Sequence, residues 1–192
     1  MHLNWKKELF TIPNLLSLFR LALIPVYIAL YLNAEETADY VAAAAVLAVS
    51  CLTDAVDGKI ARKFNMISNV GKLLDPAADK MTQLALTICL AQKYPILNPV
   101  LCLFVVKEAF QLIAVIVALC RGKVLPGALM AGKVCTTVLF ISFITLVMFP
   151  DMPELAVDGI ALLNGVFLMI SFVSYILAYF GKNKKLEDFH AE

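Results

Sequence analysis

Four aspartates, arranged as two pairs, are the residues of this chain best suited to chemistry. Asp54 and Asp57 are three residues apart, and Asp75 and Asp79 are four residues apart. These spacings place both members of a pair on one face of a helix, and the two pairs can meet across a short connection. Carboxylates that converge in a membrane are costly unless cations hold them. Two divalent cations are the simplest such partners, and they suit phosphoryl chemistry.

The remaining residues narrow the choice of metal. His2 and His190 lie near the ends of the chain, and the five cysteines lie in or beside apolar runs without a CxxC pair. We therefore expect neither a histidine catalyst nor a zinc site, and we interpret the cysteines as small buried hydrophobic residues. Hard cations prefer carboxylate oxygens, water and substrate phosphates, so the sequence predicts Mg2+ or Mn2+.

Small and basic residues separate the two aspartate pairs. Gly58 has no side chain beside Asp57, and Ala61 leaves similar room one turn later, so the backbone there can approach a phosphate or a nucleotide closely. Arg62 can neutralise a diphosphate. A single aspartate in such a place is usually a helix cap or a loop charge. Four at these spacings, with glycine and arginine between them, favour a functional site.

The aspartates lie in a chain with the composition of a membrane protein. Of its 192 residues 61% are hydrophobic, whereas about 45–50% is usual in soluble domains. The net charge of +1 gives no reason to expect a nucleic-acid partner. We predict an all-α integral membrane protein with a single domain over residues 1–192. Six transmembrane helices are expected at residues 16–32, 40–53, 79–92, 97–120, 130–149 and 155–180.

The second and third predicted helices are shorter than the roughly 20 residues that a span needs. Their polar ends carry the aspartates, so we expect both helices to project past the hydrocarbon. Asp54 and Asp57 are expected to end the second helix, and Asp75 to open the third, with Pro76 in its first turn.

Segregated charges indicate the orientation. Both termini and the connections after the second and fourth helices contain nearly all lysines and arginines, whereas the other three connections contain Lys93 and acids. We therefore expect a multi-pass protein of the inner or cytoplasmic membrane, with both termini and the active site cytoplasmic. For residues 1–15 we predict an amphipathic helix that lies on the inner leaflet and turns up into the membrane near Pro13. A frayed tail is the alternative. Residues 182–192 are expected to form a solvated cytoplasmic tail.

The aspartate segment resembles the signature of the CDP-alcohol phosphatidyltransferase family. That signature is Asp, two residues, Asp-Gly, two residues, Ala-Arg, a gap of about eight, Gly, three residues, Asp, three residues, Asp. The opening residues 12–20 and the six-helix layout are also similar, so the resemblance spans most of the chain. All eight signature positions are met, by Asp54, Asp57, Gly58, Ala61, Arg62, Gly71, Asp75 and Asp79.

The resemblance implies a phosphatidyl transfer from CDP-diacylglycerol, a homodimer, and the membrane lipids as surroundings. It implies that Asp79 contacts a metal or removes the proton of the acceptor hydroxyl. Two metal ions would be held by Asp54, Asp57, Asp75 and Asp79. The CDP moiety would be bound by Asp54, Gly58, Ala61, Arg62 and Gly71.

The acceptor is predicted from a narrower resemblance. Residues 65–80 are similar to bacterial phosphatidylglycerophosphate synthases, whose acceptor, glycerol 3-phosphate, is a dianion that needs basic side chains. Candidates for this role are Lys107, Arg121, Lys123 and Lys133. Lys107 precedes Glu108 deep in an apolar run, which indicates either an acceptor site or a self-neutralising structural pair.

Two departures keep other acceptors open. Those synthases usually carry arginine where this chain has Lys107, and a second lysine where it has Cys135. A phosphatidylglycerol acceptor, which would give cardiolipin, is therefore the main alternative, followed by another reaction of the same family. An ion or proton transporter is a distant alternative, because it would need acids along a path through the bilayer. Here only Glu108 is deep, and the four aspartates of the two pairs cluster at one face.

Overall fold

The computed structural model describes residues 12–63, 71–120, 123–124, 129–180 and 187–188, with side chains at 14–53, 74–117, 120 and 129–179. Within these residues the chain is helical, apart from one short antiparallel strand pair. The helices are α2 (Ile12–Leu32), α3 (Thr37–Lys63), α4 (Gly71–Lys93), the 3-10 helix η1 (Pro95–Leu97), α5 (Asn98–Cys120), α6 (Met130–Met148) and α7 (Glu154–Phe180). They form two compact units, of residues 1–92 with 144–151, and of residues 93–143 with 152–192.

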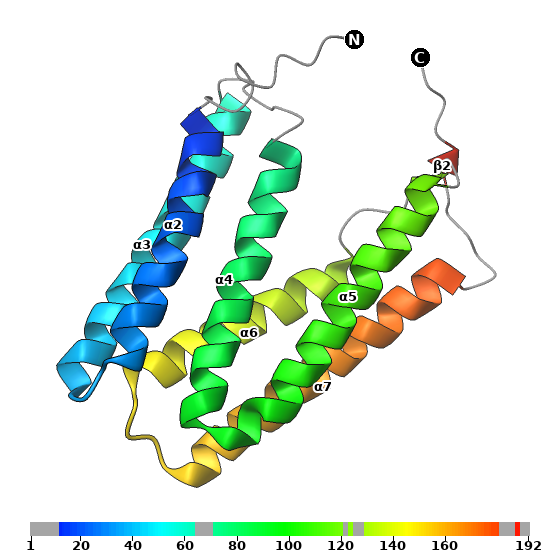
Figure 1. Cartoon of the computed structure of the whole chain (residues 1–192). Coiled ribbons are helices and arrows are strands. Elements are labelled where there is room, and N and C mark those ends of the chain that lie inside the picture. Colours follow the sequence, from blue (N-terminus) through cyan, green and yellow to red (C-terminus); the bar gives the residue numbers. More distant parts are fainter. Residues whose placement is uncertain (1–11, 64–70, 121–122, 125–128, 181–186, 189–192) are drawn as a thin grey trace. The chain divides into compact units, whose positions relative to one another are not determined.

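In the first unit, α2 and α3 form an antiparallel hairpin and lie side by side (Figure 1). The turn between them is closed by Asp39, whose carboxylate accepts hydrogen bonds of 3.1 Å from the backbone N–H groups of Glu35 and Glu36. Near this turn the rings of Tyr31 and Tyr40 meet edge to face, with centroids 5.4 Å apart. Such pairs stabilise beyond the area they bury. The hairpin thereby fixes the register of α2 against α3.

The predicted boundaries around the aspartates are wrong. The helix expected to end near Thr53 continues to Lys63, so Asp54 and Asp57 lie inside α3. Similarly, α4 begins at Gly71, not with Asp75, and Pro76 lies inside the helix. A helix that has left the apolar region still satisfies its own backbone groups, so polar residues do not end it. Both helices are therefore longer than predicted, and their projection past the hydrocarbon stays a prediction.

Helix α4 differs from the others in composition. Its interior positions include Thr82, Gln83 and Thr87, and all three are buried. The threonine hydroxyls donate within the helix, from Thr82 to the carbonyl oxygen of Ala78 at 2.9 Å and from Thr87 to that of Gln83 at 2.6 Å. Because a buried hydroxyl is costly without an acceptor, these bonds make the polar face of α4 tolerable.

Four segments of the described chain are long and apolar enough to cross a membrane: Asn14–Leu32, Pro95–Val117, Met130–Met148 and Glu154–Tyr179. The apolar part of α3, Thr37–Thr53, is shorter. Large apolar side chains on these helices are exposed, for example Leu112 at 62% and Leu162 at 71%. Exposed apolar surface of this extent needs lipid around it, so this is a membrane protein. The number of six spans stays a prediction.

In the second unit, α5 and α7 lie side by side (Figure 1). Aromatic side chains join them: the Phe110 ring lies 5.3 Å from that of Phe172 and 6.1 Å from that of Tyr179, measured between centroids. The strand pair also belongs to this unit and joins β1 (Lys123–Val124) to β2 (Glu187–Asp188). Two residues of the tail predicted to be solvated are therefore paired with the connection that follows α5.

A glycine permits close contact between α6 and α7. A Cβ added to Gly132 would lie 2.5 Å from the hydroxyl oxygen of Tyr175, much nearer than atoms in contact can come. The Tyr175 side chain is buried and its ring packs tilted against that of Tyr179, with centroids 5.7 Å apart, so it has little room to move away. The absence of a side chain at position 132 therefore fixes where Tyr175 lies.

We predict that Gly132→Ala lowers the stability of the purified protein by about 1–3 kcal/mol, the usual cost of overpacking. Thermal unfolding in detergent measures the loss. Tyr175→Phe in the same background is expected to recover part of it, because the hydroxyl is the nearest atom. Gly159→Ala is the matched control, since nothing lies within 4 Å of its added Cβ. Equal effects of the two alanines would contradict the prediction.

Candidate functional site

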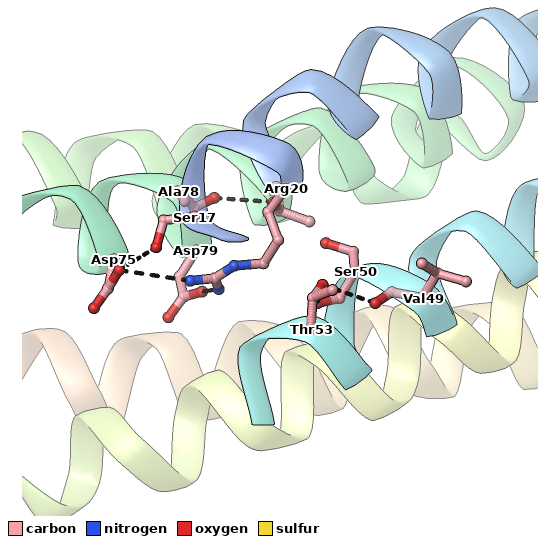
Figure 2. A network of polar contacts seen from close by, with 9 residues as sticks. Ser17, Arg20, Val49, Ser50, Thr53, Asp75, Ala78 and Asp79 are labelled. Atoms are coloured by element: carbon pink, nitrogen blue, oxygen red, sulfur yellow. Dashed lines mark hydrogen bonds and ion pairs between the residues drawn. The ribbon is translucent and has the colours of Figure 1, made fainter. Parts of the chain in front are cut away.

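The first unit brings Asp75 and Asp79 to one side of α4, where both face residues of α2. Ser17 donates a hydrogen bond from its hydroxyl to Asp75 Oδ1. Arg20 donates from one terminal nitrogen to Asp79 Oδ1 at 2.6 Å, and its other terminal nitrogen lies 3.9 Å from Asp75 Oδ1. Figure 2 shows Ser17 and Arg20 pointing from α2 towards the two carboxylates. The expectation that Asp75 and Asp79 share a helix face is met.

The burial of these groups is uneven. The Arg20 side chain is only 2% exposed, whereas those of Asp75 and Asp79 are 41% and 48% exposed. A charge so deeply enclosed in a membrane helix requires a partner of opposite sign. The arginine therefore depends on the carboxylates, while each carboxylate keeps an open side on which a further ligand can bind.

The first aspartate pair lies on α3, which carries it past the apolar region. Just before it, Thr53 donates to the carbonyl oxygens of Val49 and Ser50, each at 2.8 Å, so the helix is regular up to Asp54. The backbone of Asp54, Asp57, Gly58, Ala61 and Arg62 is helical, and Gly71 is the first residue of α4. The side chains of these predicted site residues lie outside the described residues.

The donor set fits a hard divalent cation. Asp75 and Asp79 supply carboxylate oxygens, which such ions prefer, on successive turns of one helix. Among the side chains described, no group of three or more His, Cys, Asp or Glu could hold a metal. A metal at this pair therefore needs further ligands, and the sequence offers Asp54 and Asp57 for that role.

In the second unit, two of the predicted acceptor-binding cations lie on helices that Tyr175 connects. Lys107 is 4% exposed; its ammonium lies 2.6 Å from Glu108 Oε1 and 5.7 Å from the centroid of the Tyr175 ring. Tyr175 reaches Gly132 on α6, and the neighbouring Lys133 is exposed. Arg121 and the side chain of Lys123 lie outside the described residues.

Comparison with known sequences assigns these residues to a family. A sequence profile described as CDP-alcohol phosphatidyltransferase matches residues 10–177 of this chain. The chain belongs to the CDP-alcohol phosphatidyltransferase family. The match includes both aspartate pairs, the α2 residues that contact Asp75 and Asp79, and Lys107.

Two kinds of relative within this family are similar to the chain. A CMP-forming cardiolipin synthase of Streptomyces coelicolor is 34% identical over 140 residues, which cover 71% of this chain and 64% of the relative. A CDP-diacylglycerol–glycerol-3-phosphate 3-phosphatidyltransferase of Bacillus subtilis is 31% identical over 139 residues, covering 67% and 72%. A putative cardiolipin synthase of Mycobacterium tuberculosis is 41% identical over 83 residues, covering 43% and 38%. The chain thus spans less than two thirds of the Streptomyces and Mycobacterium relatives.

Ser17 and Arg20 lie within the segment that matches the family, but the sequence did not lead us to assign them to the site. The signal was present: Asn14, Ser17 and Arg20 recur every three residues in an apolar helix, and all three are buried. A polar stripe of this kind inside a membrane helix marks a face turned towards protein. The role of Tyr175 beside Lys107 had no comparable signal, because it arises only from helix packing.

We predict that Glu108→Gln destabilises this phosphatidyltransferase-family protein by of the order of 3 kcal/mol, because it leaves the buried Lys107 ammonium without its carboxylate. Lys107→Met is expected to cost less, since it removes the buried charge itself. Chemical or thermal unfolding in detergent compares the two variants. A Lys107→Met variant less stable than Glu108→Gln would show that the buried Lys107 ammonium does not depend on Glu108.

Proposed function

We propose that the protein transfers the phosphatidyl group of CDP-diacylglycerol to the hydroxyl of an alcohol and releases CMP. The main support is the pair of carboxylates on α4, half exposed and held from behind by Arg20. Family membership and relatives named for two reactions that use a CDP-activated lipid or form CMP add to it. The four apolar spans fit a substrate whose acyl chains lie in the bilayer.

In the proposed reaction, the oxygen of the acceptor hydroxyl attacks the phosphorus that bears the diacylglycerol. The bond from this phosphorus to the CMP oxygen breaks, and CMP leaves with the electron pair. The hydroxyl proton passes to the carboxylate of Asp79, whose side chain is 48% exposed and can be reached from outside the helix pair. Gly58, Ala61, Arg62 and Gly71, together with Asp54, are proposed to bind the CDP moiety.

Asp54, Asp57, Asp75 and Asp79 are the residues proposed to hold Mg2+ or Mn2+. When bound, such ions would stabilise the negative charge that develops on the diphosphate. The residues of α2 and α4 would orient the carboxylates, and the small residues of α3 would leave room for the nucleotide. By the distribution of lysine and arginine, this site is proposed to face the cytoplasm. A homodimer stays a prediction.

Glycerol 3-phosphate is the proposed acceptor. Its phosphate is a dianion, whose recognition requires basic side chains. Lys107 on α5 lies beside the Tyr175 ring, and Lys133 follows Gly132, the residue of α6 that Tyr175 contacts, so these two lysines are the proposed acceptor cations. The relative from Bacillus subtilis, whose name includes this acceptor, is matched over most of its length.

Phosphatidylglycerol is a second candidate, because two observations weaken the basic site. Glu108 neutralises Lys107 at 2.6 Å, and the position where related synthases have a second lysine holds Cys135, a thiol that is 1% exposed. An acceptor with a phosphodiester carries less charge and needs fewer cations. Transfer to it would give cardiolipin, the product named for the Streptomyces coelicolor relative.

We predict that Asp79→Asn lowers the rate of CMP release by about 100-fold or more, the usual contribution of a general base. Because Asp79 also pairs with the buried Arg20, thermal unfolding is measured in parallel to check that the variant is folded. CMP is measured after incubation of the purified protein with CDP-diacylglycerol, acceptor and Mn2+. Chelation with EDTA is expected to stop the wild-type reaction until Mg2+ or Mn2+ is added. Asp158→Asn, which alters an exposed carboxylate on α7, is the matched control. Undiminished CMP release by Asp79→Asn would show that Asp79 is not the base.

We predict a single radiolabelled product, phosphatidylglycerophosphate, when labelled CDP-diacylglycerol is offered separately with glycerol 3-phosphate, phosphatidylglycerol, serine and inositol phosphate. Thin-layer chromatography identifies the lipid. If product forms only with phosphatidylglycerol, then phosphatidylglycerol, and not glycerol 3-phosphate, is the acceptor. CMP release without any acceptor would indicate hydrolysis.

A further inference from the structure

We propose that Arg20, assisted by Ser17, is a positioning residue for the carboxylates of Asp75 and Asp79 and thereby sets the affinity of this site for a divalent cation. This inference rests on the proposed function for its metal. It adds two residues of α2 to a site otherwise made of residues from α3 and α4.

The first argument is the matched spacing of the two helices. Ser17 contacts Asp75, and three residues later Arg20 contacts Asp79, four residues further along α4. Parallel helices place such successive pairs at the same height, one turn apart. The two contacts therefore lie one above the other along the helix pair. The Asp75 carboxylate is oriented by Ser17 and the Asp79 carboxylate by Arg20, both from α2.

The second argument is the shape of the guanidinium. One terminal nitrogen lies 2.6 Å from Asp79 and the other 3.9 Å from Asp75, so a single planar group spans both acids. Arginine can do this because its donors are fixed in a fork, whereas lysine is a point charge. The arrangement constrains the distance between the two carboxylates as well as their directions.

The third argument is the close packing of α2, α3 and α4 around Arg20. Arg20 borders a cavity of about 10 Å3 lined by residues of α2, α3 and α4, among them Tyr27, Leu47, Ser50 and Thr82. This is at most the volume of one water molecule, so the guanidinium cannot withdraw into it. With the side chain 2% exposed, Arg20 is held towards the carboxylates, while their exposed sides remain available to a cation.

Arg20→Lys separates geometry from charge, because lysine keeps the positive charge near the metal and loses the fork. Changes to groups that orient metal ligands usually cost about 10–100-fold in metal affinity or activity. We expect Arg20→Lys to weaken Mn2+ binding within this range, measured without substrate from the electron paramagnetic resonance signal of free Mn2+. We expect kcat at saturating Mn2+ to fall more than the KM for CDP-diacylglycerol rises. Ser17→Ala is expected to cause a smaller loss in the same direction.

The controls distinguish this inference from a merely structural role and from the proposed function. Lys93→Arg exchanges a cation at the far end of α4, and Thr87→Ala removes a buried hydroxyl bond of that helix; neither should change Mn2+ affinity. Thermal unfolding checks that each variant is folded, and Ser17→Ala decides the question if Arg20→Lys is not. Wild-type Mn2+ binding that Asp75→Asn abolishes, but that Arg20→Lys and Ser17→Ala leave unchanged, would overturn this inference alone. Failure of the wild-type protein both to bind Mn2+ and to release CMP would overturn it together with the proposed function.

Discussion

The burial of a positive charge inside a membrane helix governs the first unit. Arg20 lies within an apolar span and is almost completely enclosed, so its free energy depends on nearby negative charge. The partners are on α4, which obliges the start of α4 to lie beside α2 with the two helices parallel. The hairpin of α2 and α3 then completes the unit. The residues proposed to act on the substrate are thus the same residues that make the helix arrangement possible.

The second unit uses opposite charges differently. There the neighbouring Glu108 supplies the counter-charge for Lys107 on the same helix, and the Tyr175 ring covers it. No second helix has to provide the acid, so packing of α5 against α7 relies on aromatic contacts instead, such as that of Phe110 with Phe172. In the first unit the acids are the more exposed partners, so each carboxylate keeps an accessible side. In the second unit the cation is already neutralised by the next residue of its own helix.

The sequence predicted the shared helix face of Asp75 and Asp79 better than it predicted where the helices begin and end. The spacing of Asp75 and Asp79 correctly indicated a shared face, because that inference needs only the helical repeat. The ends of α3 and α4 were misplaced, because polar residues were interpreted as the end of a helix when they mark only the end of its apolar part. The contacts of Ser17 and Arg20 with the acids needed knowledge of which helices are neighbours. The stripe that they form with Asn14 shows which face is buried, but not against what.

The polarity of α4 has a consequence for how the protein enters the membrane. This helix carries Asp75, Asp79 and three buried polar residues, and it does not have the composition of a span. Partitioning into lipid on its own would expose Thr82, Gln83 and Thr87 to hydrocarbon, where polar groups without partners are costly. During synthesis α2 and α3 emerge before α4. Arg20 and Ser17 are therefore already present as partners for Asp79 and Asp75. Membrane insertion of α4 is therefore expected to be cooperative, because it requires that the hairpin of α2 and α3 has inserted first.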